Sequence, residues 1–253
     1  MRWFRADLHI HTALSPCAGA EMTPPAIVRA AVRAGLDLIG ITDHNSAANV
    51  EAVLAAARGT PLKVLPGMEV QTKEEVHLVC LFAQAGAALA WQETVYRRLP
   101  PRENEEAFFG CQLLLDARGR ERGREKRLLL TSTDLTVAEV VEEVLARGGL
   151  VIPAHVDRPA YSLIGALGFV PPGLRVEALE VSQPQNAEQV AGALAPGCRL
   201  SLVTASDAHS LSDIGRCATG FYLRGAALTE LRQALRGAGG RKVVIEQRMW
   251  FSP

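Results

Sequence analysis

The chain has 253 residues, of which 48% are hydrophobic and 21% are charged. This is the composition of an ordinary soluble globular protein, and the length suits either one large α/β barrel or two small domains. Lys and Arg together number 27, as do Asp and Glu, so a formal net charge of zero gives no global field that favours nucleic acid or a membrane.

The sequence also carries no signal for export or membrane insertion. The first residues, MRWFRADLHIHT, lack the apolar core of a secretory signal, and no apolar run reaches the roughly 18 residues that span a bilayer. The five cysteines are odd in number, widely spaced and without a C-x-x-C pair: Cys17, Cys80, Cys111, Cys198 and Cys217. We therefore expect reduced thiols and a cytoplasmic location.

The first predicted strand, at 3–8, runs into the motif Asp7-Leu8-His9-Ile10-His11-Thr12. In extended chain, His9 and His11 point to the same face because they are two residues apart. Two imidazoles on one face suit a single metal ion.

Helices and strands then alternate. A loop at 13–22 precedes a helix that Thr23-Pro24 begins and Gly35 ends. The apolar runs predict buried parallel strands at 36–42, which leads into Asp43-His44, and at 62–70. The helix between these strands is expected at 47–58 with Ser46 as its cap.

The next apolar run, 76–82, follows the strand at 62–70 after a connection too short for a helical crossover. The two strands should therefore be antiparallel neighbours. In such a hairpin the end of one strand adjoins the start of the next, so Glu69 and His77 should meet at the same rim.

Residues 83–131 are more than a minimal barrel needs and are expected to form an insertion. We predict a helix at 87–99 and a hairpin whose strands, 111–116 and 126–130, flank an Arg/Gly-rich turn. The run 118–127 holds six basic and two acidic residues. It is either a solvated hairpin tip or a docking patch for a polyanion, although it lacks the interleaved aromatics of a single-strand binding platform.

The remaining chain continues the alternation. Thr136 and Glu139 form a capping box that begins a helix ending at Gly148-Gly149. The other expected strands are 150–154, 176–181, 200–205, 217–223 and 242–247, and the other helices are 187–194 and 227–235. No linker or repeat divides the chain, so we expect a single domain over residues 1–253.

All six histidines are predicted to lie at strand ends on one rim: His9, His11, His44, His77, His155 and His209. Carboxylates accompany them at Asp7, Asp43, Glu69 and Asp207. A histidine taken singly is more often structural than a ligand, but a gathering of this size is not explained by chance. Imidazoles with carboxylates bind Zn, Mn or Fe, and the number of donors exceeds what one tetrahedral ion needs.

We therefore expect two or three divalent transition metal ions that share bridging ligands. Such ions generate hydroxide from a bridging water and hold phosphoryl oxygens during an in-line displacement.

The ordered motifs D-L-H-I-H-T, I-T-D-H-N, G-M-E-V, V-H-L-V, P-A-H and S-D-A-H closely resemble the PHP (polymerase and histidinol phosphatase) family. The resemblance spans residues 7–209. It implies an α/β fold, a distorted TIM-like (β/α)7 barrel, here with an inserted β-hairpin, and a trinuclear centre for phosphoester hydrolysis.

The resemblance also implies a distribution of ligands. His9, His11, Glu69 and Asp207 would hold one ion, and Glu69 would bridge to a second ion held by His77 and His155. His44 and His209 would hold a third. The family often completes this third site with a His or Asp in the loop after the first motif, where this chain has Cys17. Cys17 is either a thiolate ligand or a small buried thiol, and this choice decides between two and three ions.

Three residues are candidates for catalytic roles besides binding metal. Asp43 either fixes the tautomer of a ligand histidine, as Asp7 would, or ligates metal or moves a proton to the leaving oxygen. Arg158 is either a bidentate clamp for the substrate phosphate or a surface residue. Asp207 is counted both as a ligand and as a catalytic residue.

The sequence therefore predicts a cytoplasmic, metal-dependent phosphoesterase that hydrolyses a phosphate mono- or diester through a metal-bound hydroxide. Its substrate would be a small phosphorylated molecule, a nucleotide or an oligonucleotide, without membrane contact or an obligate protein partner. The alternative is a non-catalytic, metal-stabilised PHP module with a structural or regulatory role. Amide hydrolysis on a similar barrel is a weaker third hypothesis.

Overall fold

The computed structural model describes residues 1–194 and 200–246. Its main sheet has seven strands in the order β11-β10-β1-β2-β3-β4-β7, and β8 pairs with β9 beside it. These strands are β1 (Arg2–Ile10), β2 (Leu38–Ile41), β3 (Lys63–Gln71), β4 (His77–Leu81), β7 (Leu150–Pro153), β8 (Ala178–Val181), β9 (Ser201–Thr204), β10 (Thr219–Leu223) and β11 (Lys242–Ile245).

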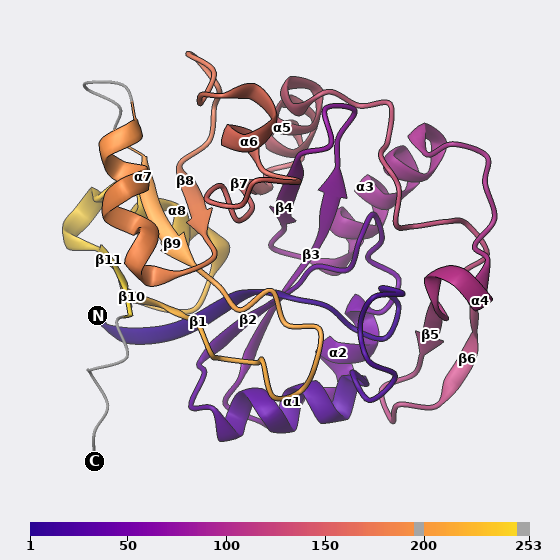
Figure 1. Cartoon of the computed structure of the whole chain (residues 1–253). Coiled ribbons are helices and arrows are strands. Elements are labelled where there is room, and N and C mark those ends of the chain that lie inside the picture. Colours follow the sequence, from indigo (N-terminus) through magenta and orange to yellow (C-terminus); the bar gives the residue numbers. More distant parts are fainter. Residues whose placement is uncertain (195–199, 247–253) are drawn as a thin grey trace.

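The strands curl into a barrel (Figure 1). β1, β2 and β3 are parallel, β4 is antiparallel to both β3 and β7, and β8 is parallel to β9. Val156 N donates to Glu180 O at 2.8 Å and joins β7 to β8, while a parallel bridge between Ile10 and Ala208 joins the end of β9 to β1. The predicted distorted barrel of seven strands is therefore confirmed, with β10 and β11 as an extension beyond β1.

Helices cover the outside of this barrel (Figure 1). They are α1 (Pro24–Arg33), α2 (Val50–Ala56), α3 (Ala85–Arg98), α4 (Glu106–Phe109), α5 (Val137–Ala146), α6 (Leu163–Leu167), α7 (Ala187–Ala193) and α8 (Leu228–Leu235). The capping box of α5 is confirmed, because Thr136 accepts from Glu139 N. The Ser46 cap is wrong: α2 begins at Val50, and the Ser46 hydroxyl donates to Gln92 instead.

The inserted hairpin exists, but its predicted second strand at 126–130 is wrong. β5 (Leu113–Leu115) pairs with β6 (Glu121–Arg124), so the turn is shorter than expected. The stretch after β6 is held instead by the Gln112 side chain, which donates to the carbonyls of Glu125 and Arg127. Leu113 N donates to Ala13 O, so the insertion packs beside the loop that follows the first histidine motif.

The barrel interior explains why polar residues gather at one end. Leu8, Leu38, Leu65, Val79, Ile152, Ala178 and Val203 come from all seven barrel strands and pack in one buried cluster. Alternation carries the same inward face from these residues to Glu69 on β3, His77 on β4 and Glu180 on β8. On β1 the register is irregular between Asp7 and Ile10, which turns His9 and His11 inward after Leu8.

Two sequence predictions touch residues outside the described part. The final strand ends at Ile245, so the predicted extension to 247 lies partly outside the described residues, as does Cys198. No disulfide joins the cysteines at positions 17, 80, 111 and 217, which the structure describes. Among residues 1–194 and 200–246, no helix has the length and apolar character that a membrane crossing requires.

Candidate metal centre

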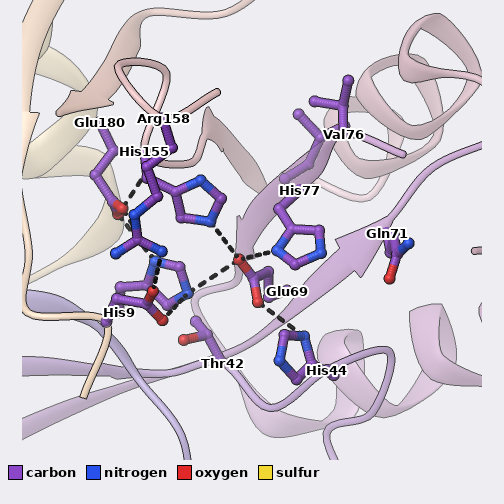
Figure 2. A network of polar contacts seen from close by, with 12 residues as sticks. His9, Thr42, His44, Glu69, Gln71, Val76, His77, His155, Arg158 and Glu180 are labelled. Atoms are coloured by element: carbon purple, nitrogen blue, oxygen red, sulfur yellow. Dashed lines mark hydrogen bonds and ion pairs between the residues drawn. The ribbon is translucent and has the colours of Figure 1, made fainter. Parts of the chain in front are cut away.

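Five of the six imidazoles lie close to one buried carboxylate, Glu69, at the rim of the barrel, and Figure 2 shows four of them around it. The ring-centroid distances are 5.2 Å for His9–His11, 4.5 Å for His11–His44, 5.3 Å for His44–His77, 5.4 Å for His77–His155 and 6.1 Å for His155–His9. His209 stacks on His11 at 4.3 Å. The predicted gathering of the histidines is confirmed, and their roles as ligands remain a prediction.

Glu69 is 1% exposed, and its carboxylate faces five imidazole nitrogens, the most distant being His11 Nε2 at 3.6 Å from Oε2. Oε1 lies 2.9 Å from His77 Nδ1, 3.2 Å from His9 Nε2 and 3.4 Å from His155 Nε2, and Oε2 lies 2.9 Å from His44 Nδ1. Neither carboxylate oxygen, however, has a partner in hydrogen-bonding geometry. Buried carboxylates normally accept hydrogen bonds. Imidazole nitrogens that lie this close to a buried carboxylate without hydrogen-bonding to it favour a cation shared between them.

One candidate set consists of His9, His11 and Glu69, and Asp207 lies beside the two imidazoles. His9 Nε2 lies 3.2 Å from His11 Nε2, and Asp207 Oδ1 lies 3.4 Å and 3.2 Å from these two nitrogens. Donors bound to one ion at about 2.1 Å are separated by about 3–3.5 Å. The distances between His9, His11 and Asp207 therefore suit donors to one ion, and Glu69 lies close enough to His9 and His11 to share it.

Two further groups of side chains have donor atoms close enough to hold an ion. One consists of His44, Glu69 and His77, and the other consists of His11, His44 and His209. His44 thus lies between the second and third sets that the sequence predicted, and it approaches Glu69 directly. The donors fit more than one ion, and the geometry does not assign each imidazole to a single ion.

Hydrogen bonds orient three of the imidazoles so that Nε2 is available as a donor to metal. His9 Nδ1 lies 3.1 Å from each carboxylate oxygen of Glu180, and His209 Nδ1 lies 2.8 Å from Asp207 O. His11 Nδ1 lies 2.9 Å from Ser15 Oγ, whose own proton goes to Asp43. Each Nδ1 is therefore the protonated nitrogen, which leaves the Nε2 lone pair for a metal.

Sequence reasoning missed Glu180 and Ser15. Glu180 is 2% exposed and also accepts from His155 N at 3.2 Å, so one carboxylate supports two histidines. The available signal was an acidic residue at an inward position near the end of the strand over Ala178–Val181, the same placement that identified Glu69. Ser15 carried no comparable signal, because its role depends on loop folding.

Asp7 and Asp43 lie beside the cluster without entering it. Asp43 accepts from Thr12 N at 2.7 Å and from the hydroxyls of Thr12 and Ser15 at 2.8 and 2.7 Å. Asp7 accepts from Ser206 N and Gly215 N, both at 2.9 Å, and so anchors the loop that carries Asp207. Burial raises the pKa of Asp7 to about 6 despite these hydrogen bonds.

Arg158 extends over the cluster from the turn after β7 (Figure 2). Its guanidinium donates to Asp207 Oδ2 at 2.8 Å, and its side chain is 42% exposed. The position suits an anion that approaches the cluster from solvent, because the guanidinium has further N–H groups to offer.

Cys17 lies on the solvent side of the cluster, next to His44 and His209. Burial alone would raise the pKa of its thiol, but the neighbouring His209 and His44 lower it to about 7. The residue as a whole is exposed and not buried, and its role as a ligand remains a prediction. A thiolate is accessible here at neutral pH, which makes the thiol suitable for Zn²⁺.

Groups of opposite charge shift one another's pKa values in the site. Burial opposes a charge on His44, but Glu69 and Cys17 raise its pKa to about 10. Burial likewise opposes ionisation of Glu69, and the surrounding histidines, His77 first, nevertheless hold its pKa well below the usual range.

Several residues at the rim have left-handed backbone conformations. Asn45, His155 and Asp207 have φ of 50°, 32° and 50°. Such values are unfavourable for residues other than glycine and cluster at functional sites. Here they turn the chain sharply at the ends of strands and aim His44, His155 and Asp207 at one centre.

Comparisons with known proteins identify relatives of this chain. The uncharacterised protein YqxK of Bacillus subtilis is 32% identical over 122 residues, which cover 44% of this chain and 29% of YqxK. The 5'-3' exoribonuclease Rnm of Escherichia coli is 28% identical over 165 residues, or 56% of this chain and 54% of Rnm. The chain thus spans only about half of Rnm and less of YqxK.

The fold is similar to that of the lesion-specific endonuclease PfuEndoQ from Pyrococcus furiosus. The two structures agree with a TM-score of 0.70 at 23% identity, over 95% of this chain and 57% of the endonuclease. Residues 187–238 match the PHP-associated family. Residues 7–133, half of the chain, match the PHP domain family and include the first four histidines and Glu69, and the chain therefore belongs to the PHP domain family.

Proposed function

We propose that this protein is a metal-dependent phosphoesterase with a di- or trinuclear centre of Zn, Mn or Fe type ions. The observation that carries the proposal is Glu69, a buried carboxylate that faces four imidazole nitrogens at 2.9–3.4 Å without hydrogen-bonding geometry. Nitrogen and carboxylate donors together are the set that these metals prefer. Bound ions would activate water and neutralise charge on phosphoryl oxygens.

The residues that would hold the ions are His9, His11, Cys17, His44, Glu69, His77, His155, Asp207 and His209. Glu69 would bridge, since each of its oxygens faces a different group of imidazoles. Glu180 and Ser15 would fix the tautomers of His9 and His11 and so keep Nε2 directed at the ions.

Arg158 would bind the phosphoryl group. Its guanidinium is already oriented by Asp207 Oδ2, while Asp207 Oδ1 faces His9 and His11. Asp207 thus links the anion-binding group to the centre. Asp43 is a positioning residue in this scheme, because its oxygens are engaged by Thr12 and Ser15 and it acts on His11 through the Ser15 hydroxyl.

A phosphoester in a nucleotide or oligonucleotide is the substrate class we favour. The support is the similarity to Rnm, which is named as an exoribonuclease and which this chain matches over about half its length. The reduced state expected of the cysteines fits a cytoplasmic enzyme acting on such substrates.

The test is metal analysis of the purified protein together with a panel of phosphomonoesters, nucleotides and short oligonucleotides. We expect bound Zn, Mn or Fe and hydrolysis that chelation abolishes. His9→Ala and Asp207→Asn should lose metal and activity, whereas Glu142→Gln, an exposed change on α5, should lose neither. Full metal content with no turnover on any phosphoester would favour the non-catalytic module instead.

A further inference from the structure

The turn that carries Arg158 also places an aromatic ring at the edge of the metal centre. The Tyr161 ring stacks on His77 with centroids 4.9 Å apart and an interplanar angle of 26°. Tyr161 is nevertheless 50% exposed. The ring thus contacts His77 while half of the residue's surface is accessible to solvent beside the centre.

Tyr161 has an unfavourable backbone conformation that hydrogen bonds of the turn maintain. Its φ is 56°, which a bulky side chain rarely adopts, and its carbonyl accepts from His77 N at 3.0 Å. The next residue, Ser162, donates to Arg158 O at 2.6 Å and accepts from Gly165 N at 2.9 Å, so the turn is closed on both sides. Strain maintained in this way at a site indicates that the position of the ring matters.

Arg158 and Tyr161 approach the centre from different sides. Arg158 pairs with Asp207, next to His9 and His11, whereas Tyr161 lies on His77. One turn therefore supplies a guanidinium suited to a phosphate and a flat ring suited to stacking, with the candidate ligands between them. A nucleotide carries both complementary groups, an anionic phosphate and a planar base.

We propose that Tyr161 stacks on the nucleobase next to the phosphate that is hydrolysed, and so selects nucleotides over other phosphoesters. The proposal rests on the phosphoesterase function proposed above. Base–aromatic stacking tolerates any base because every base has a π face. The selectivity should therefore be for the presence of a base and not for its identity.

The test compares adenosine 5'-monophosphate with ribose 5-phosphate, which presents the same ester without a base. Tyr161→Leu keeps an apolar contact with His77 but removes the ring, and Tyr161→Phe keeps the ring. We expect Tyr161→Leu to lower the ratio of kcat/KM for the nucleotide to that for ribose 5-phosphate about tenfold, mainly through KM, with Tyr161→Phe within about twofold of wild type. If the wild type hydrolyses only oligonucleotides, the pair becomes a dinucleotide with and without the base beside the cleaved bond.

A binding measurement separates this proposal from the catalytic one. Adenosine 5'-thiophosphate is titrated into metal-loaded protein by calorimetry, with metal content measured for each variant. Weaker binding in Tyr161→Leu at unchanged metal content supports stacking even if no ester is hydrolysed. The lack of hydrolysis by itself would refute only the proposed phosphoesterase activity. Equal losses on both substrates, or unchanged nucleotide binding in Tyr161→Leu, would overturn the role of Tyr161.

Discussion

Glu180 offers the sharpest test of the proposed centre, because its carboxylate contacts two of the candidate ligand histidines, His9 and His155. Its oxygens lie 3.1 Å from His9 Nδ1 and one accepts from His155 N at 3.2 Å. Glu180→Ala would leave both donors unsatisfied in a site where His9 is 0% exposed. Glu180→Gln would keep the volume and one acceptor but remove the charge.

The expected magnitude follows from the bonds lost. A hydrogen bond to a charged group contributes about 1.5–3 kcal/mol, and loss of the partner of a ligand histidine typically weakens metal binding by about 10- to 100-fold. We therefore expect a decrease of about tenfold in metal affinity for Glu180→Gln and about 100-fold for Glu180→Ala. The activity at saturating metal should fall less than the affinity.

The assay is competition with a chromophoric chelator, with Zn²⁺ and Mn²⁺ measured separately and circular dichroism to verify folding. Glu142→Gln is the matched control, since Glu142 is an exposed carboxylate on α5 that pairs with Arg175. If Glu180→Ala binds metal as tightly as this control, the orientation of His9 by Glu180 is not what prepares the site, and the reasoning is refuted.

Four further changes probe the site and the barrel. Arg158→Gln should raise KM for the phosphoester about tenfold in steady-state kinetics with a smaller effect on kcat, and a result confined to kcat would contradict the clamp. Cys17→Ser should reduce the number of Zn²⁺ ions retained, by metal analysis, but should leave Mn²⁺ binding nearly unchanged, because thiolates prefer zinc. Burial lowers the pKa of His44, but Glu69 raises it to about 10, so a metal ion that binds His44 at pH 7 must displace a proton. Metal affinity should therefore rise with pH, up to about tenfold per pH unit for each proton displaced. Chelator competition at pH 6, 7 and 8 measures this dependence, and an affinity that does not change with pH would refute it. Gly40→Ala places a Cβ in steric conflict with Leu8 O between β1 and β2, so urea denaturation should show a loss of about 1–3 kcal/mol in the free energy of unfolding. An unchanged value would contradict this expected steric cost.

The histidine pattern made much of the centre predictable. His9 and His11 are adjacent on one strand face, and His155 and His209 follow short apolar strands, so barrel geometry alone brings them to one rim. The short connection between β3 and β4 similarly predicted that Glu69 meets His77, and the structure places these side chains 2.9 Å apart. These predictions succeeded because each depends only on local periodicity and on where strands end.

Features that depend on contacts across the chain were not predictable. Gln112 holds the stretch after β6 with its side-chain amide, so the expected strand at 126–130 does not form. The Ser46 hydroxyl binds Gln92 instead of capping a helix. In both cases a side chain far along the sequence competes successfully with the local backbone pattern.

The sequence by itself therefore determined the class of fold, the family and the residues gathered at the rim. Only the tertiary structure decided which carboxylates face the centre and which support it. Glu180 pairs with His9 across 171 positions, and Asp43 is engaged by Thr12 and Ser15. The physical reason is that the direction and tautomer of an imidazole are set by the partner of its second nitrogen, and that partner arrives only when the barrel closes.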